Sequence, residues 1–364
     1  MRGKLSAVLL ISIPMLLGLP ILGVVFIGIP VNRYLEFPPE TRFIKHPPFS
    51  WKVFLAYLVI IVGLVLPFAR RGAAFARNEA HKRIWVRHFP WWGWVGIVAM
   101  VSFWLLAWTR FCWFSRFQPH TFTPLWVSFI VLINAVCFWR TGRSLMTHDT
   151  GFFLTLFPSS AAFWWFFEYL NRFVQNWHYT GVKFCAFSYA LYASISFSTV
   201  LPAVLSVREL VLEFGWIQRG FARWIQFGAV SHRVVGFVGL VGGALALFLV
   251  GIVPNVLFSM LWVAPLVVIV SVQILTGQRH VFSGLGRGDW REPISAACAA
   301  LICGWFWEMW NYLSLARWEY TIPFVDRFHI FEMPILGYAG YLPFGIECVV
   351  VGRLLKDLLG SPQP

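Results

Sequence analysis

Residues 305–311 are Trp305-Phe-Trp-Glu308-Met-Trp-Asn311, and residues 165–171 are Trp165-Phe-Phe-Glu168-Tyr-Leu-Asn171. Both stretches have the form Trp-Phe-x-Glu-x-x-Asn, and the two glutamates are 140 positions apart. A string that combines tryptophan with a paired Glu and Asn does not readily recur by chance in an apolar chain. The pattern therefore indicates an internal duplication, and a repeat has to be recognised before a fold is assigned.

Further matches flank the two copies in the same order. Each copy is preceded by an aspartate and followed by Trp-x-Tyr-Thr and then by Leu-Pro. The pairs are Asp149 with Asp289, Trp177–Thr180 with Trp318–Thr321, and Leu201-Pro202 with Leu342-Pro343. Every pair is separated by 140 or 141 positions, which predicts two repeats of the same length.

Composition indicates the class of protein. Apolar residues make up 59% of the chain and charged residues 12%, so a water-soluble fold would leave large apolar surfaces uncovered. The six cysteines show no C-x-x-C spacing, which argues against a disulfide framework or a zinc site. The net charge of +14 would favour nucleic acid as the partner of a soluble protein, but these basic residues lie between apolar spans, where they set orientation. We expect an integral membrane protein that binds no nucleic acid.

The apolar runs predict an all-α polytopic membrane protein with about ten transmembrane helices. Residues 1–90 hold two spans and a basic loop, residues 91–210 form repeat A, and residues 211–364 form repeat B with a short tail. The first two spans cover about residues 1–30 and Trp51–Phe68. Repeat A supplies spans near Trp92–Trp108, Pro124–Trp139, Phe152–Leu170 and Ala186–Val207, and repeat B near Val234–Val250, Leu257–Leu275, Ile294–Tyr312 and Phe331–Val351.

Four spans per repeat give both repeats the same orientation, so we expect a two-fold relation along the membrane normal. Residues 69–90 hold the densest positive segment: Arg70, Arg71, Arg77, Lys82, Arg83 and Arg87. Such a cluster marks the cytoplasmic side and can touch anionic headgroups. With the amino terminus inside, inner loops carry 19 Lys and Arg and outer loops carry 10. We expect a bacterial inner-membrane protein with both termini in the cytoplasm, surrounded by membrane lipids.

The duplicated polar residues are the first candidates for a site. Glu168 lies nineteen residues beyond Asp149, roughly 28 Å along a helix, so Glu168 and Asn171 are expected at the outer interface. Glu308 and Asn311 are expected at the same depth. Each Glu and Asn share a helix face because they are three residues apart. Ionisable groups in a span are costly and usually indicate a site, but such pairs can also lock helices together.

Other residues extend this outer cluster. The candidates for catalysis are Glu168, Glu308, Glu332 and Glu347, and those for substrate binding are Asn171, Asn311, Trp177, Trp318, Tyr179 and Tyr320. The tryptophans and tyrosines also fit an ordinary interfacial belt. Glu332 is expected to open the tenth span on the outer side. Glu347 has Ser206 at its matching place in repeat A, and it is either a catalytic acid or a residue that reaches water at the inner interface.

Metal and nucleotide motifs are not found. His148 and His178 are expected to be solvated loop residues. The sequence contains no nucleotide-binding glycine loop, no H-E-x-x-H and no nucleophile elbow. We therefore predict no metal and no cofactor.

The order Glu308, Asn311, Trp318, Tyr320 and Pro343 to Glu347 resembles the small membrane-embedded lycopene cyclases of bacteria, archaea and fungi. The resemblance covers about residues 290–350 and, more faintly, 150–205. That family has two adjacent acids after the proline, where this chain has Glu347 alone. The resemblance implies cofactor-independent acid chemistry on an isoprenoid or another long apolar lipid. A carboxyl shielded from water stays protonated at neutral pH and can protonate an alkene, and aromatic faces stabilise the resulting cation.

Two other classes of function remain open. A transporter or channel would equally use a four-plus-four repeat with carboxyls between the repeats, although such sites usually lie at the membrane midplane. A structural or assembly protein without chemistry would use the Glu and Asn pairs for packing alone. The distance between Glu168 and Glu308, and a lipid-sized cavity between them, would discriminate these classes.

Overall fold

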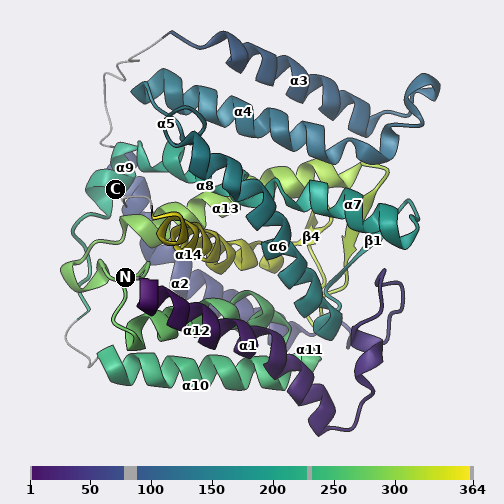
Figure 1. Ribbon diagram of the computed structural model, residues 1–364, viewed down its shortest axis with the longest axis vertical. Helices are drawn as coiled ribbons and strands as arrows, with labels where there is room; N and C mark the ends of the chain where they lie inside the picture. Colours follow the sequence, from purple (N-terminus) through teal and green to yellow (C-terminus); the bar gives the residue numbers. More distant parts are fainter. Residues whose placement is uncertain (1, 78–87, 228–231, 361–364) are drawn as a thin grey trace.

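The computed structural model describes residues 2–77, 88–227 and 232–360, and this part of the chain is 72% helical (Figure 1). The helices are α1 (Arg2–Phe26), α2 (Trp51–Arg77), α3 (Trp91–Trp108), α4 (Phe122–Thr141), α5 (Leu145–His148), α6 (Thr150–Val174), α7 (Ala186–Phe197), α8 (Val200–Leu212), α9 (Gly215–Gly220), α10 (His232–Val250), α11 (Pro254–Leu257), α12 (Ala264–Leu275), α13 (Arg291–Tyr312) and α14 (Tyr341–Leu359). The strands are β1 (Trp177–Thr180), β2 (Arg317–Tyr320), β3 (His329–Ile330) and β4 (Met333–Pro334). The predicted helical class is confirmed.

Seven helical segments of the described chain are long and apolar enough to cross a membrane. They are α1, α2, α3 and α10, together with the segments built around α4, α7–α8 and α14. The bent pair of α12 and the segment before it, Pro254–Trp262, raises the number to eight if it forms one span. Large apolar side chains are exposed along α1, α2, α3 and α10, as expected of surfaces that face lipid. These features support an integral, multi-pass membrane protein.

Helices α6 and α13, which carry the duplicated Glu and Asn, are not among the seven. Their sequences contain many tryptophans together with polar residues, and that lowers their mean hydropathy. Both pack against α8, and α13 also packs against α14. In Figure 1 these four helices lie between the pair α3 and α4 on one side and the pair α10 and α12 on the other. Helices surrounded by protein can carry polar residues that a lipid-facing helix cannot.

Prolines break three of the predicted spans. The predicted helix over Ala186–Val207 is divided at Ser198–Thr199, because Pro202 has no N–H to donate to the Ser198 carbonyl. The predicted helix over Leu257–Leu275 bends by 54° just before Pro265. The predicted helix over Phe331–Val351 is wrong at its start, since α14 begins at Tyr341 after a 3-10 segment. Proline at the first turn of a helix is tolerated, so each helix restarts there.

The described part of the chain contains two short sheets that an all-α prediction does not include. Strands β1 and β2 pair antiparallel, with Trp177 opposite Tyr320 and Tyr179 opposite Trp318. Gly181 ends β1 with φ +88°, and a Cβ there would lie 1.8 Å from the Leu315 carbonyl oxygen. Only glycine allows this backbone to approach so closely. The Trp-x-Tyr-Thr segments thus lie side by side.

Equivalent elements begin at regular offsets. Helices α3 and α10, α6 and α13, and α8 and α14 all start 141 residues apart, while β1 and β2 start 140 apart. The amino and carboxyl ends of the chain lie on the same side of the molecule, together with α5 and α9, and β1 lies at the opposite side. An even number of membrane crossings would place the termini in this way.

The basic segment is only partly described. Helix α2 continues to Arg77, beyond the predicted end at Phe68, and Arg71 donates hydrogen bonds to the carbonyls of Gly220 and Arg223. Arg71 therefore joins α2 to the chain near α9. Lys82, Arg83 and Arg87 lie outside the described residues.

Candidate functional site

Each asparagine of the duplicated motif holds the backbone of the tryptophan in its own half. The Asn171 Nδ2 donates to the Trp177 carbonyl at 2.8 Å, and the Asn311 Nδ2 donates to the Trp318 carbonyl at 2.7 Å. The backbone N–H of each tryptophan donates in return to the amide oxygen, at 3.4 Å and 2.9 Å. Both amides are buried. The asparagines thus fix the first residue of each Trp-x-Tyr against its helix.

Glu168 on α6 is buried beneath three hydrogen-bond donors. Its Oε1 accepts from the Tyr179 hydroxyl at 2.7 Å and from the Trp164 and Trp177 indoles at 3.0 Å each. Trp164 lies one turn earlier on the same helix. The Glu168 carboxyl is therefore held by residues of repeat A alone.

Glu308 on α13 is fully buried beneath two phenols. Its Oε1 accepts from the Tyr320 hydroxyl at 2.8 Å and from the Tyr341 hydroxyl at 2.6 Å. The Trp318 indole donates to the Tyr320 hydroxyl at 2.9 Å. The other carboxyl oxygen, Oε2, is buried and has no hydrogen-bond partner among the described residues.

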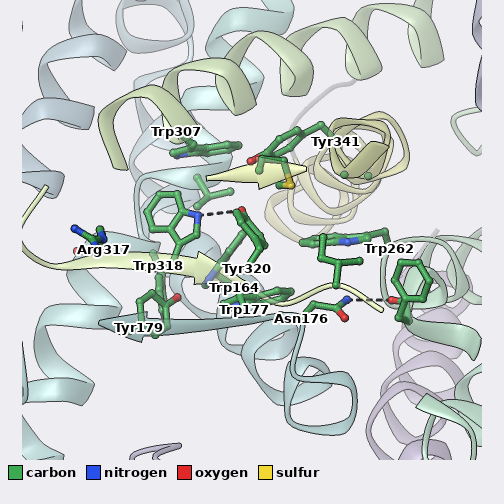
Figure 2. Close-up of a pocket in the computed structure, with 18 of the residues that line it drawn as sticks. Trp164, Asn176, Trp177, Tyr179, Trp262, Trp307, Arg317, Trp318, Tyr320 and Tyr341 are labelled. Carbon is green, nitrogen blue, oxygen red and sulfur yellow. Dashed lines mark hydrogen bonds between the residues drawn. The ribbon is translucent and has the colours of Figure 1, made fainter. Parts of the chain in front are cut away.

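A cavity of about 840 Å³ lies beside both clusters (Figure 2). Its lining is mainly apolar and contains Trp177 and Tyr179 of β1 and Trp318 and Tyr320 of β2. Other aromatic residues complete the wall: Trp164, Tyr189, Trp262, Trp307 and Tyr341. The two halves of the chain thus meet at one aromatic-walled space.

The cavity opens on the surface of the molecule along α2. Ile60 and Leu64 line it, and their side chains are also 58% and 65% exposed. Helix α2 is one of the candidate membrane spans, so this opening faces the region that lipid would occupy. An apolar ligand can enter there without crossing water.

Two polar atoms in the cavity wall lack partners. Asn176 donates through Nδ2 to the Phe258 carbonyl at 3.2 Å, but its Oδ1 is buried and has no partner among the described residues. The hydroxyl of Tyr189 is likewise buried without one in the described chain. Both residues line the cavity. Buried polar groups are normally hydrogen-bonded, so these two atoms are exceptions beside the cavity.

The structure separates the predicted site residues into two groups. Trp177, Tyr179, Trp318 and Tyr320 line the cavity. The remaining six do not contribute to its lining: Glu168, Glu308, Glu332, Glu347, Asn171 and Asn311. Glu168 and Glu308 stand one hydrogen bond behind the wall, whereas the asparagine amides are used by the backbone.

Glu332 and Glu347 are not members of the two hydrogen-bonded carboxyl–tyrosine clusters. Glu332 is half-buried in the turn between β3 and β4, which corrects the prediction that it opens the tenth span. Glu347 is buried in the middle of α14; its carboxyl interacts with the backbone N–H of Leu266 in the first turn of α12 and has no side-chain hydrogen-bond partner among the described residues. Its side chain is 2% exposed and does not itself reach the surface of the molecule.

Three residues of the cavity wall were not predicted from the sequence. Trp164, Asn176 and Tyr341 have no identical counterpart at the repeat offset, where Gly304, Arg317 and Val200 stand. A search for identities therefore passes over them. The alternation of Trp-x-Tyr could have indicated the strands, because side chains two apart share one face of a strand.

The rim of the cavity carries charge where β1 and β2 face each other. His178 pairs with Glu319 across the strands, with 3.7 Å between Nε2 and Oε2. Hydrogen bonds from Arg317 lower the pKa of Glu319, and burial lowers the pKa of His178. Glu319 is therefore ionised and His178 is neutral at neutral pH. His178 is a half-buried strand residue and not a solvated loop residue, which corrects that prediction.

Comparison of the chain with protein-family models, with curated proteins and with solved structures finds no match.

Proposed function

We propose that this integral membrane protein binds a long apolar lipid, of isoprenoid type, in the aromatic cavity and transfers a proton to or from it without a cofactor. The observation that carries the proposal is the wall of the cavity. Tyr179, Tyr320 and Tyr341 line it, and their hydroxyls are hydrogen-bonded to the buried carboxyls of Glu168 and Glu308. Ionisable groups thus stand directly behind an otherwise apolar surface.

The size and chemistry of the cavity support a lipid ligand. Ligand pockets commonly measure about 300–1,000 Å³ and combine apolar walls with a few polar groups. This cavity, at about 840 Å³, falls in the upper part of that range. Asn176 and Tyr189 supply its unpaired polar atoms, so we expect the ligand to carry at least one hydroxyl or carbonyl group.

The aromatic wall supports cationic chemistry in particular. Trp177 and Trp262 stack with their ring centroids 5.6 Å apart, and Trp307 and Tyr341 stack at 6.0 Å. Aromatic faces attract a nearby positive charge, by about 2 kcal/mol or more when water is excluded. A carbocation formed from a protonated alkene would lie among such faces.

The proposal includes two parallel four-helix repeats related by a two-fold axis. The register of β1 and β2 supports this relation, because Trp177 pairs with Tyr320 and its counterpart Trp318 pairs with Tyr179. A two-fold axis between the strands requires such reciprocal pairing. The offsets between helix starts support it as well. In this arrangement the chain crosses the membrane ten times, with both ends in the cytoplasm of a bacterial cell.

The test compares lipids from cells that express the wild-type protein or Glu308→Gln. Gln keeps the shape and the hydrogen bonds of the carboxyl but cannot cycle a proton, so the variant should lose the lipid product while remaining folded. Mass spectrometry of extracted isoprenoids provides the measurement. Glu319→Gln is the matched control, because Glu319 is a half-exposed carboxyl that does not line the cavity. Identical isoprenoid compositions in all three strains would contradict the proposed enzymatic function.

A transporter is the second candidate, and Glu347 is the observation that favours it. Its buried carboxyl has no side-chain partner among the described residues and faces the Leu266 backbone N–H at the start of α12, just after the 54° bend. Broken helices and buried carboxyls occur together at the ion sites of transporters. Solute flux through proteoliposomes that Glu347→Gln abolishes, with unchanged lipids in the expressing cells, would support transport.

A further inference from the structure

The two halves of the chain surround their glutamates with different kinds of donor. Positions 164 and 304 are equivalent in the repeat, and so are positions 200 and 341. In the first half these are Trp164 and Val200, and in the second half they are Gly304 and Tyr341. In the first half the large aromatic residue is therefore on the helix that carries the glutamate. In the second half it is on the following helix.

The residue at position 304 and the aromatic residue at position 341 depend on each other sterically. A Cβ on Gly304 would lie 2.4 Å from the ring of Tyr341, so α13 can carry no side chain where Tyr341 packs. The absence of a side chain at 304 allows the Tyr341 hydroxyl to reach Glu308 at 2.6 Å. In the first half Trp164 occupies the helix position and itself donates to Glu168. Val200 has no polar atom to offer.

The exchange changes what a proton can do in each cluster. An indole N–H only donates, whereas a phenol both donates and accepts. Two of the three donors on Glu168 are indoles, so those two contacts cannot carry a proton to or from the carboxyl. Both donors on Glu308 are phenols that line the cavity, and its Oε2 is unpartnered in the described chain. A continuous path for protons connects Glu308 with the ligand space through either phenol.

We propose that only the second half transfers the proton, with Tyr341 as the catalytic residue that delivers it and Glu308 as its source, while Glu168 is a structural counterpart that holds β1. This inference rests on the proposed function. Tyr341 is assigned to delivery because the Tyr320 hydroxyl also accepts the Trp318 indole N–H, which restrains it.

The proposed proton transfers involve only Tyr341, Glu308 and an alkene of the substrate. The Tyr341 O–H bond breaks as the π electron pair of the alkene forms a new C–H bond. Glu308 reprotonates the phenolate oxygen and becomes a carboxylate. The carbocation, held among the aromatic faces, then loses a proton from a neighbouring carbon, and that proton returns through Tyr341 to Glu308. The substrate is isomerised or cyclised, and no oxidant or reductant is consumed.

The activity test compares Tyr341→Phe with Tyr338→Phe. Tyr338 lies three residues away, donates to the Ile330 carbonyl at 3.0 Å and does not line the cavity. Loss of a general acid typically costs about 100-fold or more in rate. We expect such a loss in kcat for Tyr341→Phe with little change in KM, and wild-type activity for Tyr338→Phe. Activity in Tyr341→Phe, combined with its loss in Glu308→Gln, would overturn the role of Tyr341 but leave the proposed function standing.

A second measurement does not depend on the substrate. Infrared difference spectra of the purified protein, recorded as pH is changed, report carboxyl groups that gain or lose a proton. We expect a carboxyl band that is absent from Glu308→Gln, shifted in Tyr341→Phe and retained in Glu168→Gln. A band that disappears in Glu168→Gln instead would overturn the assignment of the two halves, whatever the lipid analysis shows.

Discussion

At the scale of single residues, the duplicated asparagine ties the loop that follows each motif helix to that helix. Asn171 and Asn311 each use both ends of the amide on the backbone of a tryptophan. Sequence comparison of the halves located these residues and the two glutamates. It could not show that the amides point at backbone and away from the ligand space, because that depends on how the following loop returns to its helix.

Replacing Asn311 should destabilise the protein without directly removing a ligand contact. Asn311→Leu leaves the N–H and carbonyl of Trp318 without their partners, and hydrogen bonds of this kind within membrane proteins are worth about 0.6–2 kcal/mol. Thermal unfolding in detergent should show a lower midpoint for Asn311→Leu and an equally lowered one for Asn171→Leu. Unchanged midpoints in both variants would contradict the structural role.

At the scale of elements, the sequence predicted where helices lie better than where they begin. Runs of apolar residues located every long helix. At Pro202, Pro265 and Pro343, however, a helix is interrupted or begins later than the apolar run predicts. The four-residue strands could not be predicted from apolar runs. The strands form because the two Trp-x-Tyr-Thr segments pair with each other, and these segments are 140 residues apart in the chain.

Helices α1 and α10 show that packing between elements depends on single glycines. A Cβ on Gly23 would lie 2.0 Å from the Phe248 carbonyl oxygen, whereas a Cβ on Gly18 of the same helix meets nothing within 4 Å. Small residues allow helix backbones to approach closely in membranes. We expect Gly23→Val to separate α1 from α10 and to lower the unfolding midpoint in detergent, and Gly18→Val to leave it unchanged. Equal midpoints for the two variants would show that this crossing is not tightly packed.

At the scale of the whole molecule, composition and hydropathy indicated a helical membrane protein and the repeat indicated its internal order. The cavity was not predictable, because its wall combines β1 and β2 with α2, α7 and the segment before α12, and no sequence pattern links the two strands to those helices. The excess of Lys and Arg in alternate loops predicts orientation independently of the fold.

Reporter fusions test that orientation. Fusions after Asn171 and after Leu313 should report the outer side, and a fusion after Gln278 should report the cytoplasm, because the inner loops carry 19 basic residues against 10 outside. Asn171 lies in the last turn of α6, whereas Leu313 and Gln278 follow α13 and α12. A reporter at Gln278 that is active outside would refute both the orientation and the parallel repeat.

The pairing of β1 with β2 has one more consequence. His178 and Glu319 occupy equivalent positions in the two repeats and face each other at the centre of the ladder. If two identical copies of one repeat paired in this way, the residue at this position would face the same residue of the other copy. A glutamate would then face a glutamate. Joining the two copies in a single polypeptide removes that restriction. The centre of the ladder can then hold a histidine against a glutamate, a complementary contact that no self-paired half-chain could make.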